Sequence, residues 1–275
     1  MKDFELTPDT HINIRPSGAS GFLHCPRKYA ATTLMGYRGW GSFATIKGSG
    51  THKAGEMIWL ESIEKGEKII NISQAKDAAA QEVEDIYQNE DIRFDKNDFA
   101  ETLDNAKDAA VDGATVFCEL AKDIDVPRFV EHTMEIDLGD NISVRGTADY
   151  ISHTGMIEDI KTSSRKTTPQ QHQVQLGIYA KLAKYSGIEN ANLQESRIQN
   201  IAFTKTKTSG YLLPFKLDEH LSSYLINDIK ERIILSRQNN YEIHLLFPTN
   251  PSSFLCNPKY CAFWYDCEAV KGRRL

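Results

Sequence analysis

Four of the five cysteines in this chain are divided between its two ends, and that distribution limits how the chain can fold. Cys25 lies near the N-terminus, whereas Cys256, Cys261 and Cys267 fall within the last twenty residues. Thiolates are metal ligands, and four of them can hold either Zn²⁺ or an iron–sulfur cluster. We therefore expect the two ends of the chain to meet at one metal site. Cys118 has no partner in this arrangement and is expected to be a small buried residue on a helix.

The composition favours metal binding over disulfide formation. The chain has 275 residues, of which 40% are hydrophobic and 25% charged, as is usual for a soluble globular protein. No apolar run approaches the roughly twenty residues that a membrane span needs, and residues 1–5 lack the pattern of a secretion signal. We therefore expect a cytoplasmic protein, and thiols in that compartment stay reduced.

The net charge of −6 argues against a protein that coats nucleic acid by charge alone. It leaves open an enzyme whose carboxylates are catalytic and whose basic groups are local. Six basic residues near the motifs described below are candidates for binding nucleic-acid phosphates. They are Arg27, Lys28, Arg165, Lys166, Lys205 and Lys207.

The first half of the chain is predicted to be largely helical. Residues 1–19 are polar and are expected to be extended, after which Ser20 can cap a helix that ends at about Leu34. The glycine-rich stretch 36–50 is expected to be a loop. Three further helices are predicted at about 51–63, 73–88 and 97–121.

The pattern changes after Pro127, where alternating apolar and polar residues predict strands. The strands cover about 128–138, 142–152, 156–162, 196–204 and 210–216, with helices at about 169–185 and 218–239. A tight His-Thr-Gly turn joins the second and third strands, and Pro169 fits the first position of a helix. The resulting order is αβββαβ.

Two acids and a lysine are predicted to converge on this sheet. Asp159 and Lys161 are two residues apart on the third strand, so their side chains leave the same face, and Asp149 can come alongside from the preceding strand. Two ionised carboxylates repel unless a cation separates them, and oxygen ligands select Mg²⁺ or Mn²⁺. Such an ion polarises a phosphate and activates water. We expect Lys161 to act as a positioned cation, since nearby carboxylates raise its pKa, whereas Glu158 falls on the opposite face.

Three motifs resemble those of the PD-(D/E)xK nuclease superfamily, and of RecB-like nuclease domains in particular. They are Gly146-Thr-Ala-Asp149-Tyr-Ile, Asp159-Ile-Lys161-Thr162 and Gln175-Leu-Gly-Ile-Tyr179. The resemblance implies a restriction-endonuclease-like α/β fold with the same αβββαβ core. It also implies that Asp149 and Asp159 bind the catalytic metal, that Lys161 assists the attacking water, and that Gln175 and Tyr179 support the site and contact DNA.

The same resemblance assigns three further residues to the metal shell. His52 matches a histidine that follows a glycine on an upstream helix, and Glu131 matches an acid of the first strand that joins the shell in some members. Ile160, between Asp159 and Lys161, is the third. Taken singly, an Asp-x-Lys pair is common by chance, His52 can be an ordinary packed histidine, and a Gln…Tyr spacing can be a polar helix stripe. The combination is what is specific.

The cysteine spacing resembles that of iron–sulfur nucleases, namely the AddB nuclease domain and CRISPR-associated relatives of RecB. In those proteins one cysteine precedes the nuclease core and three follow it, as Cys25-Pro-Arg-Lys-Tyr29 and the three C-terminal cysteines do here. The lead-in to Cys256 is similar to that of phage-encoded members, which implies a bacterial or phage-infected host cytosol. The resemblance implies a [4Fe–4S] cluster, with Zn²⁺ as the alternative, and the closed loop would restrict the unfolded state by about 5 kcal/mol.

These observations predict a Mg²⁺- or Mn²⁺-dependent deoxyribonuclease, more plausibly an exonuclease than an endonuclease, which acts on single-stranded DNA or free DNA ends in replication, recombination or repair. A nuclease that trims DNA for CRISPR spacer capture is one alternative, and a non-catalytic iron–sulfur module that binds DNA ends is another. We expect one nuclease domain over 1–275, able to form a homo-oligomer. Its parts are a helical region at 20–127, a nuclease core at 128–216 and a C-terminal helix with the cysteine-rich segment at 217–275.

Overall fold

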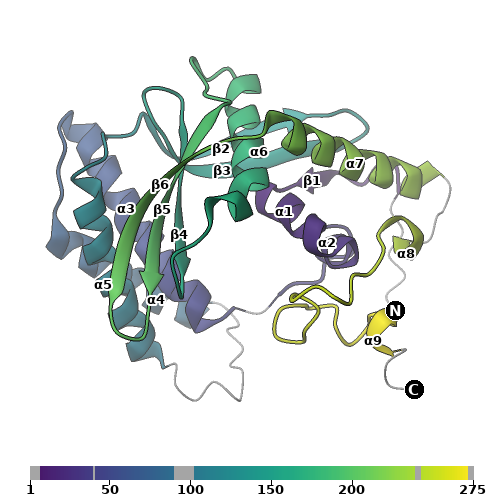
Figure 1. Ribbon diagram of the computed structural model, residues 1–275, viewed down its shortest axis with the longest axis horizontal. Helices are drawn as coiled ribbons and strands as arrows, with labels where there is room; N and C mark the ends of the chain where they lie inside the picture. The colour runs from purple at the N-terminus through teal and green to yellow at the C-terminus, as the bar shows by residue number, and fades with distance from the viewer. Residues whose placement is uncertain (1–6, 40, 90–101, 239–242, 272–275) are drawn as a thin grey trace.

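The computed structural model describes residues 7–39, 41–89, 102–238 and 243–271, and Figure 1 shows their arrangement. In chain order the elements are β1 (Ile12–Ile14), α1 (Pro16–His24), α2 (Pro26–Thr33), α3 (Phe43–Lys65), α4 (Ile72–Asn89), α5 (Leu103–Ala121), β2 (Phe129–Asp137), β3 (Ile142–Ile151), β4 (Ile157–Ser163), the 3₁₀ turn η1 (Pro169–His172), α6 (Gln173–Tyr185), β5 (Glu195–Phe203), β6 (Thr208–Lys216), α7 (Glu219–Gln238), α8 (Ile243–Leu246) and α9 (Glu268–Lys271). Of the helices in these ranges, none is long and apolar enough to cross a membrane.

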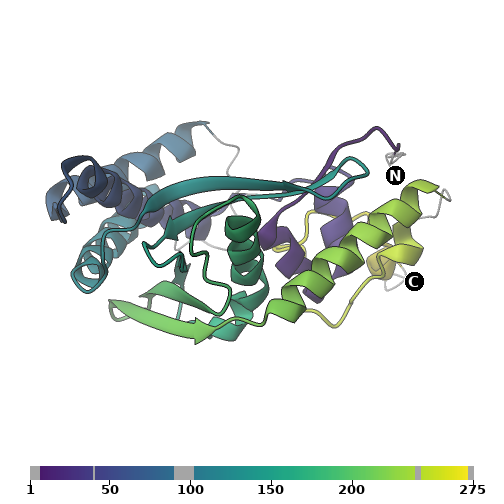
Figure 2. The same ribbon diagram turned by 90° about the horizontal axis from the view of Figure 1, so that it is seen from above.

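Helices cover both faces of a mixed sheet, which has six strands within the described ranges. Helices α3, α4 and α5 lie on one side, while α1, α6 and α7 lie on the other with the C-terminal segment (Figures 1 and 2). Each side has its own apolar core, one centred on Trp59, Phe117 and Tyr150 and the other containing Phe22 and Tyr29. The predicted α/β fold with an αβββαβ core is confirmed.

The sheet has a break in its pairing beside β3. Strand β2 pairs with β3 along nearly its whole length, so β1 and β4 must share the other edge of β3. Strand β1 takes residues 142–144 of that edge, and β4 takes only Tyr150 and Ile151. Among the described residues, positions 145–149 therefore have no strand partner on this edge. We call this opening the β3–β4 gap.

Two close approaches occur over the face of β3 at Gly146, beside the β3–β4 gap. An added Cβ at Gly146 would lie 2.7 Å from Cε1 of Tyr179 and 2.8 Å from the ring of Pro16, closer than side chains tolerate. Gly146 therefore lets α6 and the start of α1 pack directly over β3. The tyrosine of the Gln…Tyr motif is thereby brought to the strand that carries Asp149.

Helix α3 is longer than predicted, because the glycines of 36–50 do not all mark a loop. The helix begins at Phe43, where the Ser42 side chain accepts a hydrogen bond from the Thr45 N–H at 3.2 Å. Gly48 and Gly55 then allow the helix to approach the sheet, since an added Cβ would overlap Thr162 at the first and the Tyr150 hydroxyl at the second. Small residues here serve packing, a use that the sequence pattern does not separate from loop formation.

Other element predictions differ at their ends. The single helix expected from Ser20 to Leu34 is two helices, α1 and α2, because Pro26 forces Cys25 into an extended conformation with φ −159° and ψ 102°. The extended lead-in contains a short parallel strand, β1. The predicted start of the helix at 97–121 lies outside the described residues, and the remaining strands and helices agree with prediction to within a few residues.

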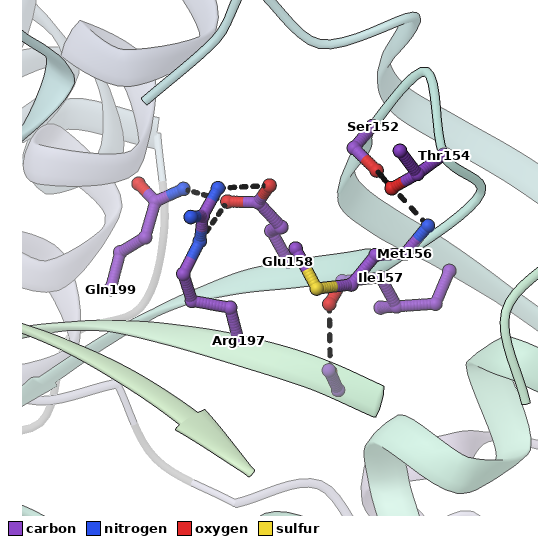
Figure 3. A network of polar contacts seen from close by, with 8 residues as sticks. Ser152, Thr154, Met156, Ile157, Glu158, Arg197 and Gln199 are labelled. Atoms are coloured by element: carbon purple, nitrogen blue, oxygen red, sulfur yellow. Dashed lines mark hydrogen bonds and ion pairs between the residues drawn. The ribbon is translucent and has the colours of Figure 1, made fainter. Parts of the chain in front are cut away.

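A buried ion pair fixes β4 against β5 on the face opposite Lys161. Arg197 donates to both carboxylate oxygens of Glu158, at 2.9 and 2.5 Å, and the Gln199 amide donates to the same group at 2.9 Å (Figure 3). Glu158 is 2% exposed, so these bonds replace the water that a carboxylate requires. Glu158 is therefore a structural acid, as its parity predicted.

We expect Arg197→Ala to lower the free energy of unfolding by about 3 kcal/mol, because it leaves the Glu158 carboxylate buried without a cation. Urea denaturation measures the change. The control is Arg145→Ala, which breaks an exposed pair with Glu135 whose nearest atoms are 3.8 Å apart and should cost under about 1 kcal/mol. Equal losses in the two variants would contradict this role.

Candidate active site

Asp149 occupies the β3–β4 gap. Its Oδ2 accepts a hydrogen bond from the Ile160 N–H at 2.7 Å and lies 3.3 Å from Nδ1 of His52 on α3. The Asp149 carboxylate thus takes the place of the β3 carbonyl group that would otherwise accept the hydrogen bond from β4. Since the N–H and C=O of one residue in a strand point to the same edge, the Ile160 carbonyl also faces the gap.

His52, Glu131 and Asp149 form a group suited to a metal ion. One ligand atom from each lies within 4.8 Å of the others. Within the described ranges this is the one such group of three or more His, Cys, Asp or Glu side chains. Two carboxylates and an imidazole are donors that Mn²⁺ and Mg²⁺ accept, so these residues fit the predicted catalytic metal.

The three side chains line a cavity of about 600 Å³ between the sheet and the helices α3 and α4. Residues from α4 had no role in the sequence-based prediction, yet Glu82 reaches this cavity. Glu56 also lines it, and both of its carboxylate oxygens accept hydrogen bonds from Lys53, at 3.0 and 2.9 Å. Lys53 offsets part of the negative charge of the cavity.

Asp159 and Lys161 form an ion pair beside this group. The Lys161 Nζ lies 2.6 Å from Asp159 Oδ2, and Asp159 is only 2% exposed. Burial acts to lower the pKa of Lys161, but the charges of Asp159 and Asp149 outweigh it, and the pKa is raised. Lys161 is therefore charged at neutral pH, which agrees with a positioned cation and not with a general base.

Asp149 and Asp159 are close enough to influence each other. Burial raises the pKa of Asp149, and the charge of Asp159 raises it further, although His52 and Lys161 oppose both effects. The cost of keeping both carboxylates ionised is a stored electrostatic strain that a divalent cation would relieve.

Helix α6 supplies the other side of the site. Burial, followed by the charges of Asp159 and Asp149, raises the pKa of Tyr179 well above its ordinary value, and Gln175 hydrogen-bonds its hydroxyl. His172, at the end of η1, was not predicted as a site residue. Burial and the charge of Lys161 lower its pKa, which places it beside the lysine. The sequence did contain a signal for His172, because it lies three residues before Gln175 and so on the same helical face.

Comparisons with known proteins give the family of this chain. A sequence model described as the PD-(D/E)XK nuclease superfamily matches residues 14–268. This chain belongs to that superfamily. The crystal structure of a putative exonuclease from Eubacterium rectale superimposes with a TM-score of 0.55 at 14% identity, over 96% of this chain and 88% of that one. The crystal structure of SSO0001 matches at 19% identity and a TM-score of 0.40, over 95% and 88%. No curated protein matches.

In this PD-(D/E)XK nuclease, Glu131 has an unusual backbone conformation. This residue has φ 45°, a conformation that is uncommon for residues with a side chain. Strain of this kind collects at functional sites, and here it accompanies a carboxylate at the edge of the nuclease cavity. Partial removal from water, followed by the charges of Asp149 and Glu56, raises the pKa of Glu131 to about 7.

Arg27, one of the six basic residues predicted to contact DNA, is in the wrong place for it. It is 4% exposed and its guanidinium lies 2.8 Å from Glu268, so it joins α2 to α9. Lys28 is beside Cys25 and Cys261, and burial lowers its pKa. Their proximity in sequence to Cys25 reflects a structural connection to the C-terminal segment.

The structure brings the four cysteines into one region. Burial raises the pKa of Cys261 and of Cys267, and nearby thiols add to both shifts, Cys25 for the first and Cys256 for the second. Cys25 lies in the kink between α1 and α2, against which the C-terminal segment packs. Cys118 is fully buried on α5, as expected.

Contacts that involve no thiol also dock this C-terminal segment. The Tyr37 hydroxyl donates to Asp266 at 2.9 Å, and Asn250 donates to the His24 carbonyl at 2.8 Å. Phe263 and Val270 form a small apolar cluster with Ala31. The two ends of the chain therefore meet, as the cysteine spacing predicted.

The raised pKa values of Glu131 and Asp149 predict how stability depends on pH. Between about 4.5 and 7 the folded protein holds a proton on Glu131 that the unfolded chain has lost, so stability without metal falls as pH rises through this window. Mn²⁺ would bind these carboxylates in their ionised form. We therefore expect Mn²⁺ to raise the Tm more at pH 8 than at pH 5.5.

Thermal melting with and without Mn²⁺ measures this difference. Glu131→Gln should reduce it, whereas Glu135→Gln, on the same strand but outside the cavity, should leave it unchanged. The same Mn²⁺ shift at both pH values would contradict metal binding by these carboxylates.

Proposed function

We propose that this PD-(D/E)XK nuclease is a Mg²⁺- or Mn²⁺-dependent deoxyribonuclease that hydrolyses phosphodiester bonds at DNA ends, in replication, recombination or repair. The observation that carries the proposal is the grouping of His52, Glu131 and Asp149 within 4.8 Å, beside the Asp159–Lys161 pair at 2.6 Å. The similarity to a putative exonuclease from Eubacterium rectale supports an exonuclease over an endonuclease.

The residues divide into metal-holding and substrate-positioning groups. His52, Glu131, Asp149 and Asp159 would hold the cation, with the Ile160 carbonyl facing the same gap. When bound, the cation would polarise the scissile phosphate and lower the pKa of water.

Lys161, held in place by Asp159, supplies a fixed positive charge where negative charge develops on the phosphate during attack. Its raised pKa keeps that charge at neutral pH. Tyr179, anchored by Gln175, has its pKa raised as well and so stays a neutral hydrogen-bond donor. Both groups would orient the substrate without taking up a proton.

We expect Asp149→Asn and Lys161→Ala each to reduce cleavage by at least about 100-fold, because each removes charge at the reacting phosphate. A 5′- or 3′-labelled oligonucleotide with Mn²⁺ measures the rate. Without metal, Asp149→Asn should keep or raise the Tm, since a neutral amide replaces a desolvated carboxylate. Lys216→Ala, on β6 outside the cavity, is the matched control, and cleavage retained in Lys161→Ala would defeat the mechanism.

We also propose that Cys25, Cys256, Cys261 and Cys267 hold a [4Fe–4S] cluster. Thiolates on one Zn²⁺ at a Zn–S distance of about 2.3 Å would lie about 3.8 Å apart. In the described chain, no three of these sulfurs are within 4.8 Å of one another. A single-zinc site is therefore not preformed, whereas the division of the thiolates, one before the nuclease core and three after it, is the pattern of the iron–sulfur nucleases that the chain resembles. The half-buried Lys28 beside Cys25 and Cys261 would compensate the negative charge of the thiolates.

Protein prepared without oxygen should be coloured, with absorbance near 400 nm and bound iron. Cys25→Ala should lose both and should melt at a lower temperature, because the link between the chain ends is removed. Cys118→Ala removes a buried thiol elsewhere and should keep the colour and the iron. Iron content that is unchanged in Cys25→Ala, or zinc in place of iron in the wild type, would refute the cluster.

A further inference from the structure

A second cavity opens next to the nuclease cavity at the end of β4. Its volume is about 430 Å³, and it is lined by Ser163, Ser164, Arg165, Lys166, Thr167, Thr168 and Gln171. We call it the β4-end pocket. Thr162 lines the nuclease cavity and Ser163 lines the β4-end pocket. These consecutive residues of β4 face opposite sides of the sheet, and Ser163 shares the face of Lys161.

The two cavities carry opposite charge. The nuclease cavity is lined by Glu56, Glu82, Glu131 and Asp149, against which stand His52 and Lys53. The residues that line the β4-end pocket include two cations and four hydroxyl groups, and none is acidic. Arginine, lysine, serine and threonine are the side chains that contact nucleic-acid phosphates most often, so the pocket fits a phosphate group.

Buried Asn200 fixes the loop that forms the pocket. Its Nδ2 donates to the Lys161 carbonyl at 2.8 Å and to the Ser163 hydroxyl at 2.9 Å, and its Oδ1 accepts from the Thr167 N–H at 2.9 Å. One fully buried side chain therefore holds both ends of the loop against the catalytic strand. Because the loop is already ordered without a ligand, binding a phosphate would lose little conformational entropy.

The backbone at Arg165 and the side chain of Lys166 are also held. Lys166 Nζ lies 4.8 Å from the ring centroid of Tyr211 on β6, and the Ser163 hydroxyl donates to the Arg165 carbonyl at 2.5 Å. Thr167 shares a 2.9 Å hydrogen bond with His172 Nε2, which ties the loop to the α6 side of the site. The position of the pocket relative to Lys161 is thus set by several independent contacts.

We propose that the β4-end pocket binds a second phosphate of the DNA strand, adjacent to the phosphate that is cleaved. The proposal rests on the deoxyribonuclease function and adds to it a subsite that sets which linkage is cut. The ligand is a phosphate group, either an internal diester or a terminal monoester. If the ligand is an internal diester, the pocket fixes which linkage of the DNA strand lies at Lys161. If it is a terminal monoester, the pocket fixes how far from the DNA end the strand is cut.

The test compares the wild-type protein with Arg165→Gln/Lys166→Gln on single-stranded oligonucleotides with Mn²⁺. The double variant should raise KM about tenfold, with a smaller change in kcat. It should also lower the slope of log affinity against log salt by about 0.7 for each phosphate that the variant no longer neutralises. Lys181→Gln/Lys184→Gln, on α6, removes the same charge away from the pocket and should change neither value.

Modified substrates identify the phosphate. In a set of oligonucleotides, each carries one neutral methylphosphonate linkage at a different position. One of these substitutions should slow cleavage by the wild-type protein, and the same substitution should not slow cleavage by the double variant. If removal of a terminal phosphate has this effect instead, the ligand is the monoester. Equal sensitivity of both proteins to every modification would overturn the subsite while leaving the nuclease intact. A wild-type protein that cuts no DNA would overturn both proposals.

Discussion

The hydrogen bond from the Ile160 N–H to Asp149 keeps the candidate active site open. At this point β3 and β4 stop pairing through their backbones, and a carboxylate takes the place of a strand neighbour. A continuous sheet would bury both backbones and leave no room for a ligand at the reacting residues. The gap therefore combines two functions, since it satisfies a buried N–H group and it presents an acid to the cavity.

Holding that acid is costly without a cation. The carboxylates of Glu131 and Asp149 have oxygens within 4.8 Å of each other. Two unit charges about 5 Å apart repel each other by roughly 3 kcal/mol at an effective dielectric constant near 20. This is a large share of the total stability of a domain, which is about 5–15 kcal/mol. His52 and the Asp159–Lys161 pair offset part of this repulsion. The repulsion that remains contributes to the raised pKa of Glu131 and of Asp149. The apolar packing of the two cores, one on each side of the sheet, stabilises the fold enough to offset this electrostatic repulsion.

The sequence was most informative where an interaction is local. Alternation predicted the strands, and the two-residue spacing of Asp159 and Lys161 predicted that they share a face and that Glu158 does not. It was least informative where distant segments approach closely. The glycines of α3 were interpreted as a loop because their use, contact with Thr162 and Tyr150, depends on residues about 100 positions away. Arg27 was interpreted as exposed for the same reason, since its partner Glu268 is brought near only by the fold.

The separation of charge between the two cavities bears on how an acidic protein can act on a polyanion. The nuclease cavity by itself repels phosphate, because its carboxylates outnumber its basic groups. A strand held only there would depend wholly on the divalent cation. The β4-end pocket offers a phosphate a basic environment that needs no metal, and its loop is fastened to the Lys161 carbonyl. A phosphate bound there would be held at a fixed position relative to Lys161, because the buried Asn200 amide bonds both the Lys161 carbonyl and the pocket loop.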